Sequence, residues 1–150
     1  MPPPYCYDHP RPMVTVDLVV FTRIDGAEHV LLIRRRRDPF AGSWAIPGGY
    51  LEMDEAPEAG ARRELREETG LIIPGPVEPI GFFGEPDRDP RGRTITLAFA
   101  AILAGTDHRI EGGDDAAEAA WQPLDGHFAL AFDHAKILGA ARDWLARQVG

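Results

Sequence analysis

The sequence has a single cysteine, no long apolar run and fewer basic than acidic residues. Because Cys6 stands alone among the 150 residues, no disulfide can form within the chain, which favours a reducing compartment. No apolar stretch approaches the ~20 residues that a membrane-spanning helix requires, and no signal peptide is evident before Met13. We therefore expect a cytoplasmic protein with no membrane partner.

The shortage of positive charge bears on the choice of ligand. The chain has 24 Asp and Glu residues against 16 Lys and Arg residues, a formal net charge of −8. Binding to a nucleic-acid backbone needs clustered positive charge, so no nucleic-acid partner is expected. A small nucleotide is still compatible with this balance, because a bound divalent cation reverses the local sign.

Proline is concentrated at the N-terminus. Five prolines within residues 1–12 prevent a helix there, because proline lacks the backbone N–H and clashes with the preceding turn. We expect residues 1–12 to form an extended arm that lies on a neighbouring subunit, and therefore a homodimer. Residues 13–150 are expected to form one domain, which is long enough to bury its own core.

Strand and helix patterns alternate along this domain. Apolar and valine-rich runs predict strands at 14–22, 29–35, 77–83, 94–103 and 119–123, and residues 38–48 are expected to form a loop. Apolar residues at helical spacing predict a last helix over 135–148, with Asp133 as its N-cap. We expect His134, next to this cap, to be a structural hydrogen bonder. The pattern favours an α/β fold.

The most informative segment is a helix predicted over 57–69, with a proline at its first position and a glycine directly after its last. Glu64, Glu67 and Glu68 are spaced i, i+3 and i+4, so they project from one face of this helix. Three carboxylates this close repel one another unless a cation lies among them. Hard oxygen ligands suit Mg²⁺ or Mn²⁺. Arg63 lies four residues before Glu67 and is expected to hold it by an ion pair.

Two residues are expected to weaken this helix, and two to anchor it. Ala56 stands at the N-cap position, where serine or threonine contributes ~1 kcal/mol. Gly60 lies inside the helix, where it costs about 1 kcal/mol relative to alanine. Ala61 and Leu65 are expected to form the buried stripe.

The pattern around the helix resembles the Nudix box, G-x5-E-x7-R-E-U-x-E-E-x-G-U with U apolar. Every defined position is matched, by Gly49, Glu55, Arg63, Glu64, Leu65, Glu67, Glu68, Gly70 and Leu71. The resemblance implies the Nudix α/β/α sandwich with a mixed central β-sheet. It also implies an enzyme that hydrolyses, with Mg²⁺, the pyrophosphate bond of a nucleoside diphosphate linked to another group.

The same resemblance implies roles for individual residues. The three glutamates would bind Mg²⁺ or Mn²⁺ together with the carbonyl of Gly48, and Glu55 and Arg63 would orient these ligands. The general base is left open between Glu64 and an acid in segment 112–118. The candidates in that segment are Asp114, Asp115 and Glu118, with a solvated turn as the alternative.

Three motifs outside the box resemble the bacterial ADP-ribose pyrophosphatase group. They are G-E-P-D-R-D-P-R-G-R at 84–93, which includes Pro86, G-D-D-A-A-E-A at 113–119 and A-F-D-H-A-K-I at 131–137. This resemblance extends over about residues 11–149 and implies hydrolysis of ADP-ribose to AMP and ribose 5-phosphate. Substrate contacts are expected from Arg35, Trp44, Arg88, Arg91 and Arg93. For Trp44 a position in the core is the alternative.

Two other functions fit parts of the pattern. A MutT-like nucleoside triphosphate pyrophosphatase would share the metal site but gives no reason for the 84–93 loop. A sensor that binds ADP-ribose without turnover, as in NAD-responsive repressors, often has a damaged box, whereas the box of this chain is intact.

Overall fold

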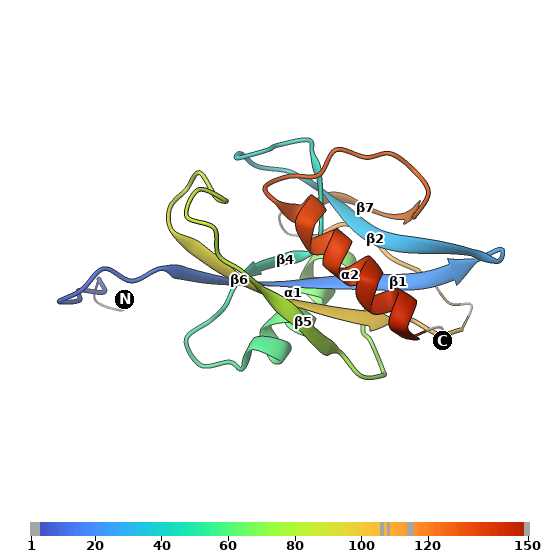
Figure 1. The fold of residues 1–150 in the computed structure, drawn as a ribbon, viewed down its shortest axis with the longest axis horizontal. Helices are drawn as coiled ribbons and strands as arrows, with labels where there is room; N and C mark the ends of the chain where they lie inside the picture. Colours follow the sequence, from blue (N-terminus) through green and yellow to red (C-terminus); the bar gives the residue numbers. More distant parts are fainter. Residues whose placement is uncertain (1–3, 106, 108, 114–115, 149–150) are drawn as a thin grey trace.

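The computed structural model describes residues 4–105, 107, 109–113 and 116–148. In this part of the chain, seven strands form one sheet and two helices pack against it (Figure 1). Neither of these helices is long and apolar enough to cross a membrane. The helices are α1 Pro57–Thr69 and α2 His134–Gln148, and the strands are β1 Met13–Ile24, β2 Ala27–Arg35, β3 Trp44–Ala45, β4 Gly48–Tyr50, β5 Glu78–Phe83, β6 Thr94–Ile102 and β7 Ala116–Pro123.

Strand β1 is the centre of the sheet. It pairs in parallel with β6 and antiparallel with β2, which gives the order β3-β2-β1-β6-β5. The short strand β4 also pairs with β1, and β7 pairs with β2. The mixed sheet that the sequence predicted is confirmed.

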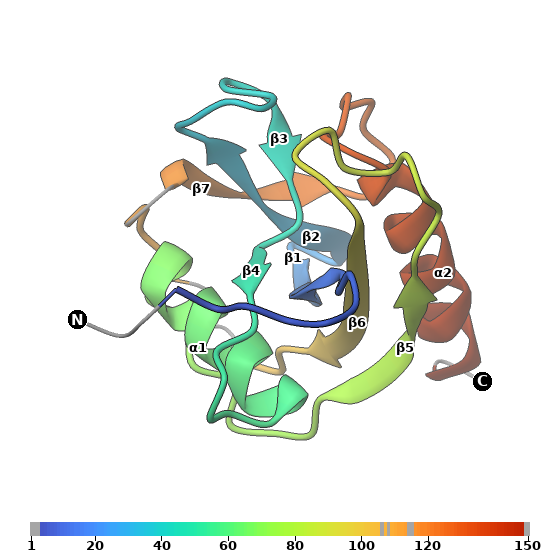
Figure 2. The ribbon, with the colours of Figure 1, turned by 90° about the vertical axis from the view of Figure 1, so that its left-hand side faces the viewer.

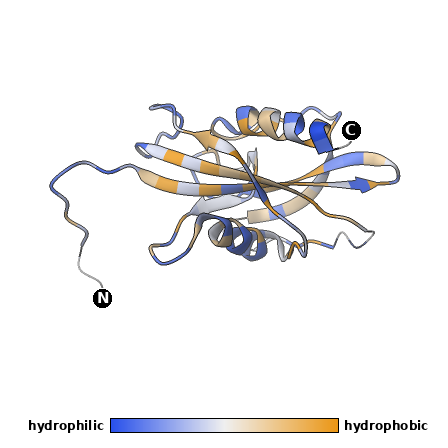
Figure 3. Ribbon diagram, turned by 60° about the horizontal axis from the view of Figure 1, so that its bottom comes forward, coloured by the Kyte–Doolittle hydropathy of each residue, from blue (hydrophilic) through white to orange (hydrophobic). Residues whose placement is uncertain are grey.

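The side chains of β1 alternate between two cores, because successive residues of a strand point to opposite faces of the sheet. Val19 and Phe21 are fully buried in the cluster that includes α2. Val16, Leu18 and Val20 are fully buried in the cluster that includes α1. Figures 2 and 3 show the two helices on opposite faces of the sheet, with apolar strands between them. The α/β/α sandwich is therefore confirmed.

Helix α1 has the bounds and ends that the sequence predicted. Gly70 takes the left-handed conformation at φ 75°, and its N–H donates to the carbonyl of Arg66 at 2.8 Å. Ala56 makes no side-chain cap hydrogen bond. Ala61 and Leu65, each 1% exposed, anchor the helix in the core. The helix is thus fixed by its buried stripe and its C-terminal cap.

Three local predictions differ from the structure. The segment expected as a loop, 38–48, contains β3 and the start of β4, which are too short to show a strand period in the sequence. Strand β7 begins at residue 116, earlier than expected, because its first part is rich in alanine, a weak strand former. Helix α2 begins at His134, one residue earlier than predicted, so Asp133 stands at the N-cap position as expected, while its carboxylate accepts two hydrogen bonds from Arg88, at 3.0 and 2.7 Å.

The N-terminal segment extends away from the domain. Residues 4–12 are exposed and lie outside any helix or strand (Figure 1). Within the arm, the rings of Tyr5 and Tyr7 stack with centroids 6.3 Å apart, and the guanidinium carbon of Arg11 lies 3.7 Å from the Tyr7 ring centroid.

Gly60 has a packing reason for its place inside α1. A Cβ atom there would lie 2.8 Å from an Oε atom of Glu55 and 2.9 Å from a methyl carbon of Leu51. Both distances are shorter than van der Waals contact. Gly139 in α2 offers the opposite case, because a Cβ atom there would meet no atom within 4 Å.

We therefore expect the two glycines to respond differently to alanine. Gly139→Ala should raise the free energy of unfolding by about 1 kcal/mol, the gain in helix propensity. Gly60→Ala should show no gain or a loss, because the new methyl group displaces Glu55 or Leu51. Urea unfolding of both variants measures this, and an equal stabilisation by the two substitutions would contradict the packing argument.

Candidate functional site

One cavity of about 460 Å³ collects most of the polar residues that the sequence singled out. Helix α1 contributes Glu64, Glu67 and Glu68, and β4 contributes Gly48 and Gly49. The remaining wall comes from β1, from the end of β2, from the 84–93 loop and from the start of α2. Besides Tyr50, which is the last residue of β4, the lining includes Asp17, Arg35, Arg37, Arg88, Asp89, Arg91, Phe132 and His134.

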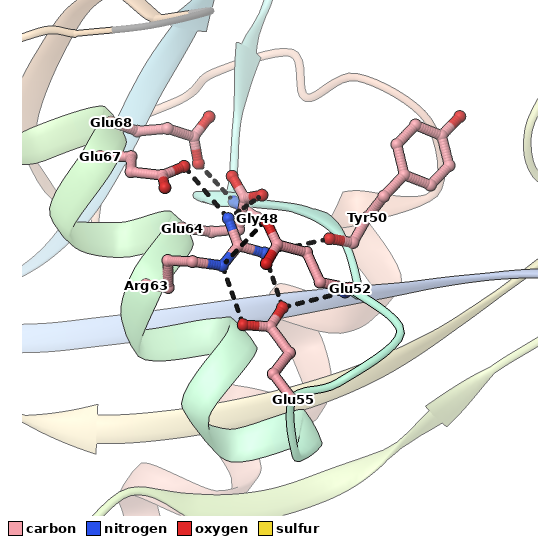
Figure 4. A network of polar contacts seen from close by, with 8 residues as sticks. All are labelled: Gly48, Tyr50, Glu52, Glu55, Arg63, Glu64, Glu67 and Glu68. Atoms are coloured by element: carbon pink, nitrogen blue, oxygen red, sulfur yellow. Dashed lines mark hydrogen bonds and ion pairs between the residues drawn. The ribbon is translucent and has the colours of Figure 1, made fainter. Parts of the chain in front are cut away.

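Arg63 organises the carboxylates at this end of the cavity (Figure 4). Its Nε and Nη2 atoms donate to the two carboxylate oxygens of Glu55 at 2.9 and 2.7 Å. Its Nη1 atom donates to Glu64 at 3.0 Å and to Glu67 at 3.1 Å. The predicted ion pair between Arg63 and Glu67 is present. One guanidinium therefore joins the turn before α1 to two of the three box glutamates on the helix.

The pKa values in this network follow from its hydrogen bonds. Those from Arg63, together with one from the backbone N–H of Glu52 at 3.0 Å, lower the pKa of Glu55 to about 2. The hydrogen bond to Glu55 in turn raises the pKa of Arg63 above its ordinary value. Both groups therefore stay charged throughout the neutral range.

Glu68 is held from the other side, by β4. One of its carboxylate oxygens accepts a hydrogen bond from the N–H of Gly48 at 2.8 Å, and the residue is 4% exposed. The first two residues of β4, Gly48 and Gly49, leave no room for a Cβ atom. A Cβ atom at Gly49 would lie 2.5 Å from the carboxylate carbon of Glu64, and one at Gly48 would collide with Asp17. The glycine pair lets the backbone approach the carboxylates.

The three box glutamates have the ligand chemistry that a hard divalent cation needs, but in this structure Arg63 is bonded to two of them. Among the residues that the structure describes, no three His, Cys, Asp or Glu side chains are placed together to hold an ion. Arg63 donates a hydrogen bond to one carboxylate oxygen of Glu64 and to one of Glu67, and the N–H of Gly48 donates to one of Glu68. These three carboxylates line one cavity and supply the oxygen ligands that Mg²⁺ and Mn²⁺ prefer.

A buried polar network lies behind the glycine pair. The Nδ1 atom of His134 accepts a hydrogen bond from the N–H of Ile46 at 3.0 Å, so the structural role expected for His134 is observed. Burial lowers the pKa of His134, which keeps the ring neutral and Nδ1 free to accept. The carboxylate of Asp17 accepts from the hydroxyl of Thr96 at 2.5 Å, and burial raises the pKa of Asp17.

The arginines expected to contact substrate fall into two groups. Arg35, Arg88 and Arg91 line the cavity. Arg93, in contrast, donates to the carbonyl of Gly84 at 2.5 Å and is not among the described residues that line it.

Trp44 and the candidate bases are more scattered. Trp44 packs against the core on the α2 side, which corresponds to the alternative position, and the guanidinium of Arg34 lies 5.1 Å from its ring centroid. Glu118 pairs with Arg34 at 3.2 Å on β7, apart from the described cavity lining. Of the candidate bases, Glu64 lines the cavity, and Asp114 and Asp115 lie outside the described residues.

Several lining residues were missed by the sequence analysis. Asp17 could have been noticed, because it is the one charged residue within the valine-rich strand predicted over 14–22. Arg37 is the last of four consecutive arginines, residues 34–37, where no local signal separates a lining side chain from a solvated one. Tyr50 and Phe132 have no such signal either, because loop and strand-end aromatic residues are common in cores and at surfaces.

Known proteins resemble this chain in sequence and in structure. The chain is 41% identical over 134 residues to the ADP-ribose pyrophosphatase of Methanocaldococcus jannaschii. The aligned region covers 89% of this chain and 75% of that protein. It is 34% identical over 140 residues to the ADPR responsive transcriptional repressor NtrR of Acinetobacter baylyi. This aligned region covers 89% of this chain and 54% of the repressor. The chain therefore spans about half of that second relative.

A solved structure shows the same arrangement of elements. The NUDIX domain of Shewanella oneidensis NrtR, crystallised with ADP ribose, superposes with a TM-score of 0.85 at 32% identity. The superposition covers 93% of this chain and 94% of that domain. A family model of the NUDIX domain matches residues 11–144, which include the sheet and the complete box helix. The sandwich, the intact box and these matches together show that the chain belongs to the Nudix family.

Proposed function

We propose that the protein is a Nudix pyrophosphohydrolase that cleaves the diphosphate of ADP-ribose to give AMP and ribose 5-phosphate. The observation that carries the proposal is the composition of one cavity. Its α1 side presents Glu64, Glu67 and Glu68, and its β2 end presents Arg35 and Arg37. A site with acidic and basic sides suits a diphosphate bound together with divalent cations. The similarity to an ADP-ribose pyrophosphatase supports ADP-ribose as the substrate.

Members of this family generally use a divalent metal ion. We propose Mg²⁺, with Mn²⁺ as a substitute, held by the three box glutamates and by the carbonyl of Gly48. When bound, the metal neutralises phosphate charge and lowers the pKa of a bound water. Arg63 acts as a positioning residue because it donates hydrogen bonds to Glu64 and Glu67, and Glu55 acts through Arg63, which it holds by two hydrogen bonds. Arg35 and Arg37 can donate hydrogen bonds to phosphate oxygens.

Glu64 is our proposed general base. It lines the cavity, and its carboxylate has one oxygen toward Arg63 at 3.0 Å. The alternative Glu118 is engaged with Arg34 on β7. A base has to come within hydrogen-bond reach of the attacking water. The position of Glu64 beside the other box glutamates meets this need better than the position of Glu118.

Two other functions have specific support. The similarity to an ADPR responsive repressor, and to an NrtR domain crystallised with ADP ribose, favours binding of ADP-ribose, with or without turnover. The complete box, with all three glutamates and Arg63 present, argues against a sensor without turnover. A MutT-like triphosphatase would use the same carboxylates, so kinetics have to separate it from our proposal.

Cellular location and subunit pairing stay predictions. A cytoplasmic location is supported by the single exposed cysteine, Cys6, which has no disulfide partner in the chain. A homodimer is supported by the exposed, proline-rich arm of residues 4–12, which extends away from its own domain.

The first prediction from this proposed function concerns the metal ligands. Glu67→Gln and Glu68→Gln should each lower kcat by about a hundredfold or more, because each removes an anionic ligand without changing the side chain's shape. Glu58→Gln is the matched control, since Glu58 lies on the same helix but pairs with Arg62 outside the cavity lining. Near-wild-type rates of both ligand variants at saturating Mg²⁺ would remove the metal assignment.

The second prediction concerns the substrate. We expect ADP-ribose to have the highest kcat/KM in a panel with 8-oxo-dGTP, other nucleoside triphosphates, NADH and a dinucleoside polyphosphate, since discrimination is a ratio of these values. A triphosphate preferred over ADP-ribose by about tenfold, or about 1.4 kcal/mol, would show that the substrate proposal is wrong. Tight binding of ADP-ribose with no product formed would identify a sensor instead.

The third prediction concerns assembly. Light scattering at micromolar concentration should give about twice the monomer mass of 16.5 kDa. Deletion of residues 1–12 should shift the protein toward the monomer, because the arm would supply part of the interface. A wild-type mass near that of the monomer would contradict the proposal.

A further inference from the structure

Three flat side chains line the cavity beside the carboxylates: Tyr50, Arg91 and Phe132. The guanidinium carbon of Arg91 lies 5.1 Å from the ring centroid of Tyr50 and 5.2 Å from that of Phe132. Tyr50 is 43% exposed, so its ring is accessible to a ligand in the cavity. Figure 4 shows its ring pointing away from the box glutamates, so this surface is separate from the proposed metal end.

The Nε and Nη2 donors of the Arg91 guanidinium already bind a carboxylate of the protein. Its Nε and Nη2 atoms donate to the carboxylate of Asp89 at 3.1 and 2.8 Å, and its backbone N–H donates there at 2.9 Å. Asp89 is 5% exposed; burial raises its pKa, but the hydrogen bonds from Arg91 outweigh this and hold the pKa below its usual value. The pair is therefore close to neutral overall. What Arg91 offers a ligand is mainly the flat face of its guanidinium.

Arg88 next to it is engaged in the same way. Its Nε and Nη2 atoms donate to the carboxylate of Asp133 at 3.0 and 2.7 Å, and its side chain is 4% exposed. Bidentate capture of a phosphate uses this same fork geometry. The wall formed by the 84–93 loop thus suits a flat, uncharged group better than a second phosphate.

Phe132, which lines the cavity beside this loop, and its neighbour Phe40 are both held in an uncommon backbone conformation. Phe132 has φ 52° and Phe40 has φ 63°, both in the left-handed region that bulky residues rarely adopt. Their ring centroids lie 4.8 Å apart, and the guanidinium carbon of Arg35 lies 4.9 Å from the Phe132 centroid. Such conformations persist where the surrounding contacts fix them, and they are concentrated at ligand sites.

We propose that Tyr50, Arg91 and Phe132 form the subsite that holds the nucleobase of the substrate. Aromatic rings and guanidinium planes are the surfaces on which proteins stack bases. The inference rests on the proposed function, since it assumes a nucleotide whose diphosphate lies at the box glutamates. The carbonyl of Tyr50 accepts a hydrogen bond from Arg63 at 3.2 Å, so the guanidinium that orders the carboxylates also fixes this surface.

The test compares ligands that represent the two halves of ADP-ribose. AMP and ribose 5-phosphate each have one phosphate, but only AMP has a base. We expect Tyr50→Ala to weaken AMP binding by about tenfold or more, measured by calorimetry on the full chain with Mg²⁺, and to leave ribose 5-phosphate binding within about twofold. Tyr50→Phe, which keeps the ring, should restore most of the AMP affinity. Phe82→Ala is the matched control, since Phe82 is 77% exposed on β5 and outside the cavity lining.

The remaining outcomes overturn the subsite. These are an unchanged AMP affinity in Tyr50→Ala, an equal loss for both ligands, a loss confined to ribose 5-phosphate, or no AMP binding by the wild type at millimolar concentration. Because the readout is binding, it is independent of turnover. If the wild type fails to hydrolyse ADP-ribose but Tyr50→Ala still loses AMP affinity, the base subsite stands and the proposed hydrolysis falls.

Discussion

The site depends on one electrostatic constraint, the balance of several carboxylates by the single guanidinium of Arg63. Glu55, Glu64 and Glu67 all lie within 3.1 Å of it, and without a cation among them these groups would repel one another. The arrangement keeps the carboxylates together before any metal binds. A metal that binds as proposed would have to compete with Arg63 for oxygens of Glu64 and Glu67, whereas Glu55 would continue to hold the guanidinium.

The rest of the fold positions this network. Ala61 and Leu65 fix the face that α1 turns to the cavity, and Gly48 brings the β4 backbone to Glu68 at 2.8 Å. His134 holds the same segment from the α2 side through the N–H of Ile46. The two helices, which lie on opposite faces of the sheet, thus both contact the short segment 46–48 beside the site. This explains why the box begins with Gly49, because a Cβ atom there would lie 2.5 Å from the carboxylate carbon of Glu64 on the helix.

The sequence predicted what is encoded locally. Helix α1, its Gly70 cap, its buried stripe and the spacing of its glutamates all depend on residues within a few turns of one another. Other features depend on pairs far apart in the chain, such as Arg88 with Asp133, 45 residues away, and Asp17 with Thr96, 79 residues away. No local pattern shows that Arg88 is engaged with a partner, or that Tyr50 and Phe132 face the same cavity. Short strands such as β3 were missed because two residues have no period.

The central claim is that the box glutamates hold divalent metal against a diphosphate in this cavity. The most direct measurement is a crystal structure with Mn²⁺ and a non-hydrolysable α,β-methylene analogue of ADP-ribose, in which anomalous scattering locates the ions. We predict Mn²⁺ at about 2.1 Å from carboxylate oxygens of Glu64, Glu67 and Glu68, the distance usual for a small divalent ion, and bridged to the analogue. An ion bound elsewhere, or an analogue seated away from these glutamates, would contradict the account.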